Sequence, residues 1–214
     1  MAVKAVLFDM DGLVMDSERS YFEVERDVLA RQGYKMTEEK YCKLCGKRGD
    51  QISIMLEEFF PGLDQEKYRK EFVEEFFPRV VEVPQTVKPG FWELIRELDK
   101  RGIKKYIVTS SGIDSTTKKL TLSGIIDCFD DTFTGEMVKR SKPAPDMYLH
   151  AQEKAGVAKE ECLILEDSEA GVGAAINAEI PCICVPDMIA PPKELTDKCL
   201  LVAKTLADAI PYLD

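Results

Sequence analysis

Four short runs of consecutive apolar residues, separated by stretches with helical periodicity, restrict the fold of this chain more than any other feature. The runs are Val6–Phe8, Tyr106–Val108, Cys162–Leu165 and Cys182–Val185, with a weaker fifth candidate at Asp131–Thr134. Continuous apolarity is typical of strands that are buried on both faces of a parallel sheet. Strands that alternate with helices favour an open, doubly wound sheet with right-handed crossovers. We therefore predict an α/β fold with a mostly parallel, Rossmann-like sheet.

Two segments within this alternation carry clear helix signals. Apolar residues at i, i+3, i+4 and i+7 begin at Phe91, directly after a Pro-Gly pair, and the segment is closed by Gly102. A second helix, rich in alanine and glycine, is predicted from Glu169 to Ala178. Both helices lie between apolar runs, as a doubly wound fold requires.

The alternation is interrupted once, between the first run and Pro89. This stretch contains no convincing strand, but it has strong helical patterning. We interpret residues 16–85 as a helical domain inserted into a core that consists of residues 1–15 and 86–214. The chain would cross between the two parts at residues 11–17 and 83–86, where glycine and proline mark turns.

Composition narrows the classes of function. The 214 residues carry a formal net charge of −10, which disfavours binding to nucleic acid or to an anionic membrane surface. No apolar run approaches the roughly 18 to 20 residues that a membrane span requires. Seven cysteines, an odd number in largely apolar surroundings, suit a reducing compartment, so we expect a cytoplasmic protein. We also expect it to be a monomer.

Polar residues follow the apolar runs at the positions where this fold binds ligands. Because the carboxyl ends of parallel strands share one edge, we expect these side chains to converge. They are acids after the first and third runs, hydroxyls after the second run, and a lysine in a later loop that contains prolines: Asp9, Asp11, Glu166, Asp167, Ser110, Ser111 and Lys142.

This set of residues is suited to a metal and a phosphate. Carboxylates that are crowded together repel one another unless a cation lies among them. The Asp-x-Asp and Glu-Asp pairs offer the hard oxygen ligands that Mg²⁺ prefers. Lys142 and the groups around Ser110 would complement an anion at that metal. A carboxylate in line behind a phosphate can act as a nucleophile and form an acyl phosphate.

The same residues resemble the four ordered motifs of the haloacid dehalogenase-like phosphohydrolases, and the resemblance covers essentially the whole chain. The matching segments are Asp9-Met10-Asp11-Gly12, Ser110, Ser141-Lys142-Pro143-Ala144-Pro145-Asp146 and Glu166-Asp167-Ser168. The helical insertion resembles the cap domain that this superfamily places after its first motif.

The resemblance implies a role for each residue. Asp9 would be the nucleophile, and Asp11 would be the general acid that protonates the leaving oxygen and then the base that activates water. Mg²⁺ would be held by the carboxylates of Asp9 and Asp167 and by the main-chain carbonyl of Asp11. Glu166 would be a further metal contact or an orienting group. Ser110, Ser111 and Lys142 would bind the phosphoryl group.

The type of cap resembles that of β-phosphoglucomutases and small sugar-phosphate phosphatases. In the mutases a histidine on the following helix helps to distinguish sugar from water, and Tyr21 stands at that position here. A basic segment that includes Lys47 and Arg48 is a candidate counter-charge for an anionic substrate. We therefore predict a magnesium-dependent phosphatase that acts on a small phosphorylated metabolite, with Tyr21, Lys47 and Arg48 as candidate substrate contacts. The resemblance implies that this metabolite is a sugar phosphate.

Three other functions are compatible with parts of the pattern. A phosphoglucomutase-type isomerase would use the same aspartyl phosphate but return the phosphoryl group to the sugar. A signalling receiver domain also combines acids, Mg²⁺, a hydroxyl and a lysine, but receivers are phosphorylated after a middle strand and lack the helical insertion. A catalytically silent binding protein is disfavoured because none of the four motifs is broken.

Overall fold

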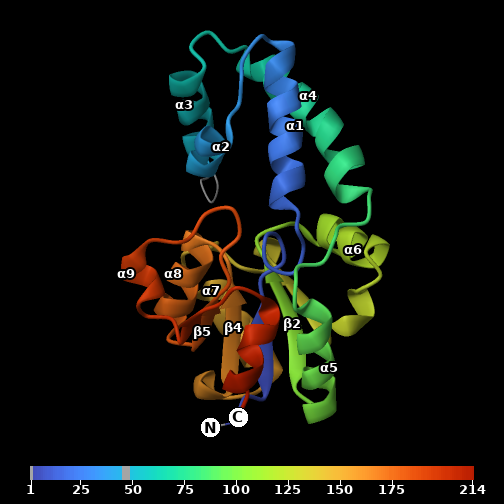
Figure 1. The fold of residues 1–214 in the computed structure, drawn as a ribbon, viewed down its shortest axis with the longest axis vertical. Coiled ribbons are helices and arrows are strands. Elements are labelled where there is room, and N and C mark those ends of the chain that lie inside the picture. Colours follow the sequence, from blue (N-terminus) through green and yellow to red (C-terminus); the bar gives the residue numbers. More distant parts are fainter. Residues whose placement is uncertain (1, 45–48) are drawn as a thin grey trace.

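The computed structural model describes residues 2–44 and 49–214, and its central element is a parallel sheet (Figure 1). Six strands lie in the order β3-β2-β1-β4-β5-β6, and each neighbouring pair is parallel. Their bounds are β1 (Ala5–Phe8), β2 (Lys104–Thr109), β3 (Asp131–Thr134), β4 (Cys162–Glu166), β5 (Cys182–Cys184) and β6 (Leu201–Val202). The predicted doubly wound α/β fold is confirmed.

All five apolar candidates are strands, and the central ones are buried throughout. Every residue of β1, β4 and β5 is buried, as expected for strands that are covered on both faces. The strand β6 was not predicted; it is an edge strand of two residues in which Val202 is 49% exposed. So short and half-exposed a strand carries no continuous apolar run.

Two hydrophobic clusters cover the two faces of the sheet. On one face, Val6 and Phe8 pack with residues of α5 (Phe91–Arg101) and of the final 3₁₀ helix η5 (Leu206–Tyr212). On the other face, Ala5 and Leu7 pack with residues of α7 (Asp146–Ala155) and α8 (Glu169–Ala178). The remaining elements of this part are α6 (Ile113–Leu122), α9 (Lys193–Thr196) and the 3₁₀ helices η2 (Ile126–Cys128), η3 (Gly135–Met137) and η4 (Lys159–Glu161).

The insertion is helical and has a hydrophobic cluster of its own. It contains α1 (Glu18–Arg31), α2 (Glu38–Leu44), α3 (Gly49–Phe59), α4 (Gln65–Phe76) and the π-helix η1 (Phe77–Val81). Val24, Val28 and Phe60 are among the buried residues of this third cluster. The insertion stands at one end of the sheet, opposite the two chain termini (Figure 1). Within the described parts of the chain, none of the helices has the length and apolarity needed to cross a bilayer.

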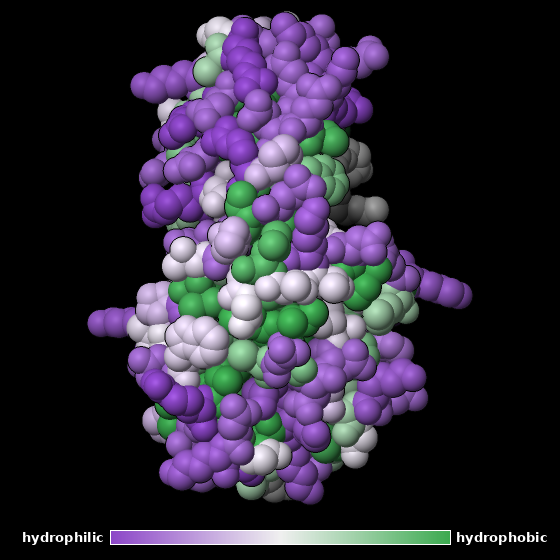
Figure 2. Space-filling view, turned by 90° about the vertical axis from the view of Figure 1, so that its right-hand side faces the viewer, coloured by the Kyte–Doolittle hydropathy of each residue, from purple (hydrophilic) through white to green (hydrophobic). Residues whose placement is uncertain are grey.

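The two chain crossings between the sheet and the insertion lie side by side. The amide of Asp16 donates to the carbonyl of Thr86 at 2.9 Å, and the amide of Lys88 donates to the carbonyl of Val14 at 2.9 Å. Met15 and Val87 form an antiparallel bridge between the same two segments. In the space-filling view the insertion is largely hydrophilic, and hydrophobic side chains gather below it around the middle of the molecule (Figure 2). These backbone contacts hold the entry and the exit of the insertion together.

Candidate active site

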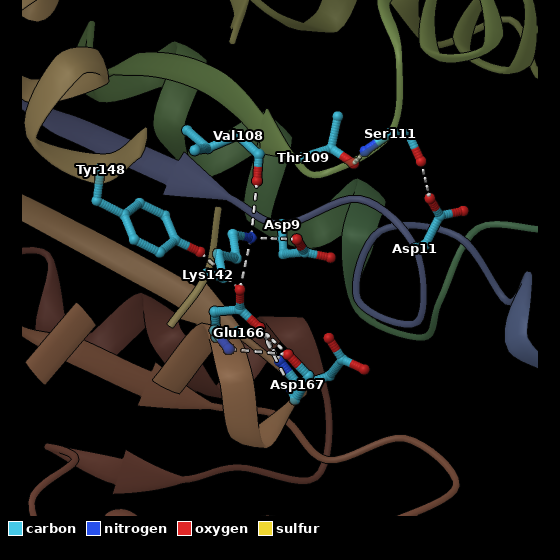
Figure 3. Close-up of polar contacts among 11 residues, drawn as sticks. Asp9, Asp11, Val108, Thr109, Ser111, Lys142, Tyr148, Glu166 and Asp167 are labelled. Carbon is cyan, nitrogen blue, oxygen red and sulfur yellow. Dashed lines mark hydrogen bonds and ion pairs between the residues drawn. The ribbon is translucent and has the colours of Figure 1, made fainter. Parts of the chain in front are cut away.

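The site lies at the carboxyl edge of the sheet, where β1, β2 and β4 end. Lys142, from the loop before α7, points between Asp9 after β1 and Glu166 at the end of β4 (Figure 3). Its ammonium donates to Asp9 Oδ1, to Glu166 Oε1 at 2.7 Å and to the carbonyl of Val108 at 2.9 Å. Four separate stretches of chain therefore meet at one lysine, as the order of strands requires.

Lys142 is held in its charged form by its neighbours. Its side chain is 5% exposed, and burial alone would lower its pKa. The carboxylates of Asp9 and Glu166 outweigh burial and raise the pKa of Lys142 above its ordinary value. The site therefore presents a fixed cation, which is what an incoming phosphate group requires.

The carboxylate of Glu166 is fully buried, and both of its oxygens accept hydrogen bonds. Oε1 accepts from Lys142 and from the hydroxyl of Tyr148 at 2.7 Å. Oε2 accepts from the amides of Asp167 and Ser168 at 3.0 and 3.2 Å and from the Ser168 hydroxyl at 3.2 Å. This arrangement fits an orienting group for Lys142 better than a metal ligand, since each oxygen already has donors.

Asp9, Glu166 and Asp167 each offer an oxygen within 4.8 Å of the others, and of these three carboxylates those of Asp9 and Asp167 remain as candidate metal ligands. Burial, with Glu166 as a further cause, raises the pKa of Asp9 to about 7 against the lowering effect of Lys142. Burial, followed by Glu166 and Asp9, raises the pKa of Asp167 well above its ordinary value. Asp167 Oδ1 is buried without a hydrogen-bond partner among the described residues. A cation here would favour the charged carboxylates and satisfy that oxygen, so the residues fit Mg²⁺.

Gly12 allows the first motif to approach Asp167 closely. Its φ of +83° is a conformation that side chains rarely adopt, and a Cβ atom would lie 2.4 Å from Asp167 Oδ2. The glycine of the Asp-x-Asp-Gly motif is therefore required by both the turn and the acid beside it.

Asp11 lies apart from the Lys142 group and is turned toward Ser111 (Figure 3). Its Oδ2 accepts from the Ser111 hydroxyl at 2.9 Å, and its Oδ1 accepts from the Ser17 hydroxyl at 2.7 Å. The ammonium of Lys119 also donates to Oδ1, at 2.7 Å. Ser111 and Lys119 are thus both partners of Asp11 in the structure. Lys119 was not predicted from the sequence.

A cavity of about 1200 Å³ lies between the sheet edge and the insertion. Asp9, Asp11, Ser110, Lys142 and Asp167 line its floor, and the other walls come from the insertion, from α8 and from the segment between β5 and β6. Residues from those walls include Lys43, Gln51, Met55, Phe59, Met188, Ile189 and Lys198. The cavity brings the predicted chemical groups and the insertion to one compartment, which is large enough for a small metabolite.

Of the three candidate substrate contacts in the insertion, the structure describes only Tyr21. The hydroxyl of Tyr21 accepts from Lys119 at 3.0 Å, so it lies beside Asp11. Lys47 and Arg48 lie outside the described residues. Lys43, four residues before Lys47, lines the cavity and forms an ion pair with Glu39 at 3.0 Å. The prediction that this segment supplies counter-charge therefore stays a prediction.

Comparison with known proteins agrees with the motifs and the geometry. The sequence model of the haloacid dehalogenase-like hydrolases matches residues 6–185. The chain belongs to this family. A relative from Thermotoga maritima, the phosphorylated carbohydrates phosphatase, is 32% identical over 83% of this chain and 82% of its own length. Hexitol phosphatase B of Escherichia coli strain K12 is 30% identical over 86% of this chain and 84% of its own length.

These matches confirm the predicted resemblance and the prediction that this haloacid dehalogenase-like hydrolase is a phosphoric monoester hydrolase. The crystal structure of β-phosphoglucomutase from Clostridium difficile covers 96% of this chain and 92% of its own, with a TM-score of 0.74 and 22% sequence identity. At that identity, the likeness concerns the fold. This chain and that enzyme therefore share one overall fold.

Proposed function

We propose that this hydrolase is a magnesium-dependent phosphatase that acts on a small phosphorylated metabolite, of the sugar-phosphate class, through an aspartyl phosphate on Asp9. The observation that carries the proposal is the joint position of Asp9, Asp167 and the buried ammonium of Lys142 at the floor of one cavity. The two relatives named for phosphorylated carbohydrates and hexitols support the class of substrate.

The chain's own residues divide the reaction into two displacements. The Asp9 carboxylate bonds to phosphorus while the bond from phosphorus to the ester oxygen breaks, and Asp11 gives a proton to that oxygen. Asp11 then takes a proton from water, whose oxygen bonds to phosphorus as the Asp9–phosphorus bond breaks. Lys142 and Ser110 hold the phosphoryl oxygens in place during both steps.

The carboxylates of Asp9 and Asp167 and the main-chain carbonyl of Asp11 would hold Mg²⁺. When bound, the metal supplies positive charge against the phosphoryl oxygens and against the crowded carboxylates. Glu166 fixes the position of Lys142 through the contact at 2.7 Å, and Tyr148 fixes Glu166 in turn.

We also propose that residues 16–85 act as a cap over a catalytic core of residues 1–15 and 86–214. The insertion's separate hydrophobic cluster and the two paired crossings support this division. Because residues of the insertion form part of the cavity wall, its movement would open and close the site to water and to product.

The test is a panel of phosphorylated metabolites assayed with Mg²⁺ by phosphate release and ranked by kcat/KM. Asp9→Asn and Asp11→Asn should each abolish turnover, because each removes one reacting group, and circular dichroism should show that both variants remain folded. Asp127→Asn, at an exposed position in η2, is the matched control and should keep full activity. Substantial phosphate release by Asp9→Asn would contradict the assigned nucleophile.

The rival isomerase is separated by its product. We expect β-glucose 1-phosphate, where it is accepted, to yield free phosphate, since water receives the phosphoryl group. Formation of glucose 6-phosphate in excess of free phosphate would instead assign the protein to the mutases.

A further inference from the structure

Lys119 is a second buried lysine beside the site, and no step of the proposed reaction uses it. It lies on α6, and its side chain is 0% exposed. An ammonium that is withdrawn from water costs several kcal/mol unless it is paired, and an apolar residue of similar size could fill the space at lower cost. A lysine at this position therefore calls for an explanation beyond packing.

The contacts of Lys119 join the core to the insertion. Its ammonium donates to Asp11 Oδ1 at 2.7 Å and to the hydroxyl of Tyr21 at 3.0 Å. It also lies 5.1 Å from the centre of the Tyr21 ring, within the range of a cation–π contact. Asp11 belongs to the loop after β1, and Tyr21 belongs to the first turn of α1, so one ammonium contacts both the core and the first helix of the insertion.

The orientation of Asp11 depends on few other groups. Ser17 and Ser111 donate to its two oxygens, and both are uncharged hydroxyls whose hydrogen turns to suit its acceptor. Lys119 supplies the single full charge that contacts this carboxylate among the described residues. A group that transfers protons must be placed to within a fraction of an ångström, and a 1 Å displacement can cost about a hundredfold in rate.

We propose that Lys119 and Tyr21 are positioning residues for Asp11. Lys119 fixes the carboxylate beside the sheet edge, and Tyr21 ties this fixed position to α1, so the placement of the insertion sets the placement of the proton-transfer group. The inference rests on the proposed role of Asp11 as general acid.

The test compares Lys119→Met with Lys118→Met. Both variants lose one ammonium from α6, but Lys118 points outward, is 47% exposed and pairs with Glu82 at 2.6 Å. Each variant is assayed with the best alkyl phosphate from the panel and with 4-nitrophenyl phosphate, whose leaving group departs as a stable anion and needs little protonation. The readout is kcat/KM for the alkyl phosphate divided by kcat/KM for 4-nitrophenyl phosphate. This ratio is informative because kcat/KM reports the step in which the leaving oxygen departs.

In Lys119→Met we expect this ratio to fall roughly tenfold or more, since general acid catalysis typically contributes a factor of about 10² to 10⁴. The melting temperature should be retained, because methionine fills the buried space. Tyr21→Phe should shift the ratio in the same direction by less, and Lys118→Met should leave it unchanged.

A ratio in Lys119→Met that stays within about twofold of the wild-type value would overturn the positioning role, as would an equal fall for both esters. If Lys119→Met does not fold, Tyr21→Phe, which removes a single oxygen atom, decides by the same ratio. These outcomes are distinct from failure of the proposed function, which would appear as absence of phosphate release by the wild-type protein.

Discussion

Glu25, on α1, shows at the scale of one residue how burial changes the charge state of a carboxyl group. It is 7% exposed inside the insertion and accepts a hydrogen bond from the Tyr68 hydroxyl at 2.7 Å. Burial, with Glu18 as a further cause, raises the pKa of Glu25 to about 7 although Tyr68 acts in the opposite direction. The folded protein therefore binds this proton more tightly than the unfolded chain, whose Glu25 keeps the ordinary value of 4.5. Stability from this group is complete below about pH 4.5 and is lost as the pH rises through about 7.

Glu25→Gln should remove this pH dependence. The glutamine carbonyl can still accept from Tyr68, but it never becomes charged, so the variant should gain about 2–4 kcal/mol relative to the wild type at pH 8, at about 1.4 kcal/mol per pKa unit. Melting temperatures measured by circular dichroism at pH 5 and pH 8 test this. We expect a rise of several degrees at pH 8 and little change at pH 5. An equal effect at both pH values would show that Glu25 is already charged at pH 5.

The acids and the lysine of the site were predictable because each follows a buried strand or stands in a short motif. Asp9 and Asp167 needed only the rule that strand ends share one edge, whereas Lys142 was predicted from its proline-containing loop and from the motif it matches. Lys119 escaped prediction because its partner is more than 100 residues away and the choice depends on how α6 is rotated about its axis. One signal was present: Lys119 precedes the buried Leu120 and follows the buried Thr116 by three residues, so it stands on an inward face.

The start of α8 illustrates how an element is fitted to the site. Ser168 caps the helix by accepting from the amide of Gly171 at 3.0 Å, and its own amide and hydroxyl donate to Glu166. A Cβ atom on Gly171 would lie 1.7 Å from Glu166 Oε1. Since five donors hold the Glu166 carboxylate, that carboxylate cannot yield without releasing Lys142.

Gly171→Ala should therefore lower both activity and stability. Helix propensity alone would make alanine favourable by roughly 0.5–1 kcal/mol, so a loss would come from the collision with Glu166. Gly173→Ala is the matched control, because it stands on the same helix and its Cβ would lie 3.3 Å from a Pro143 side-chain carbon, a tight contact that a shift of a few tenths of an ångström relieves. We expect at least a tenfold lower kcat/KM and a lower melting temperature in Gly171→Ala, and small changes in the control. Equal behaviour of the two variants would refute this account of Gly171.

At the scale of elements, the predictions were correct where the sequence pattern ran over many residues and missed elements where it was short. The helix predicted from Glu169 to Ala178 has these bounds in the structure, and the helix from Phe91 ends at Arg101, directly before Gly102. The edge strand β6 and the π-helix η1 were not predicted. Two residues, or a single wide turn, leave no pattern in the sequence, and tertiary packing decides their conformation.

For the whole molecule, we predict from the crowded carboxylates that a divalent cation stabilises the folded state. Mg²⁺ at about 100 times its dissociation constant would add about 2.7 kcal/mol. In a protein of this size that amount raises the melting temperature by roughly 5–10 °C. Differential scanning calorimetry with MgCl₂, against NaCl at equal ionic strength, measures the effect, and Asp167→Asn should remove most of it. Excess EDTA should also stop turnover. Full activity in EDTA, or identical melting curves with and without Mg²⁺, would contradict the metal site.

The adjacent crossings at residues 14–16 and 86–88 make the molecule modular. Entry and exit of the insertion are neighbours in space, so a different helical segment with the same two ends can be grafted there while the sheet keeps its register. If the proposed cap selects the substrate, recognition of the alcohol and transfer of its phosphate can diverge at separate rates. We then expect chimaeras between relatives joined at these two points to inherit their preference from one parent and their chemistry from the other.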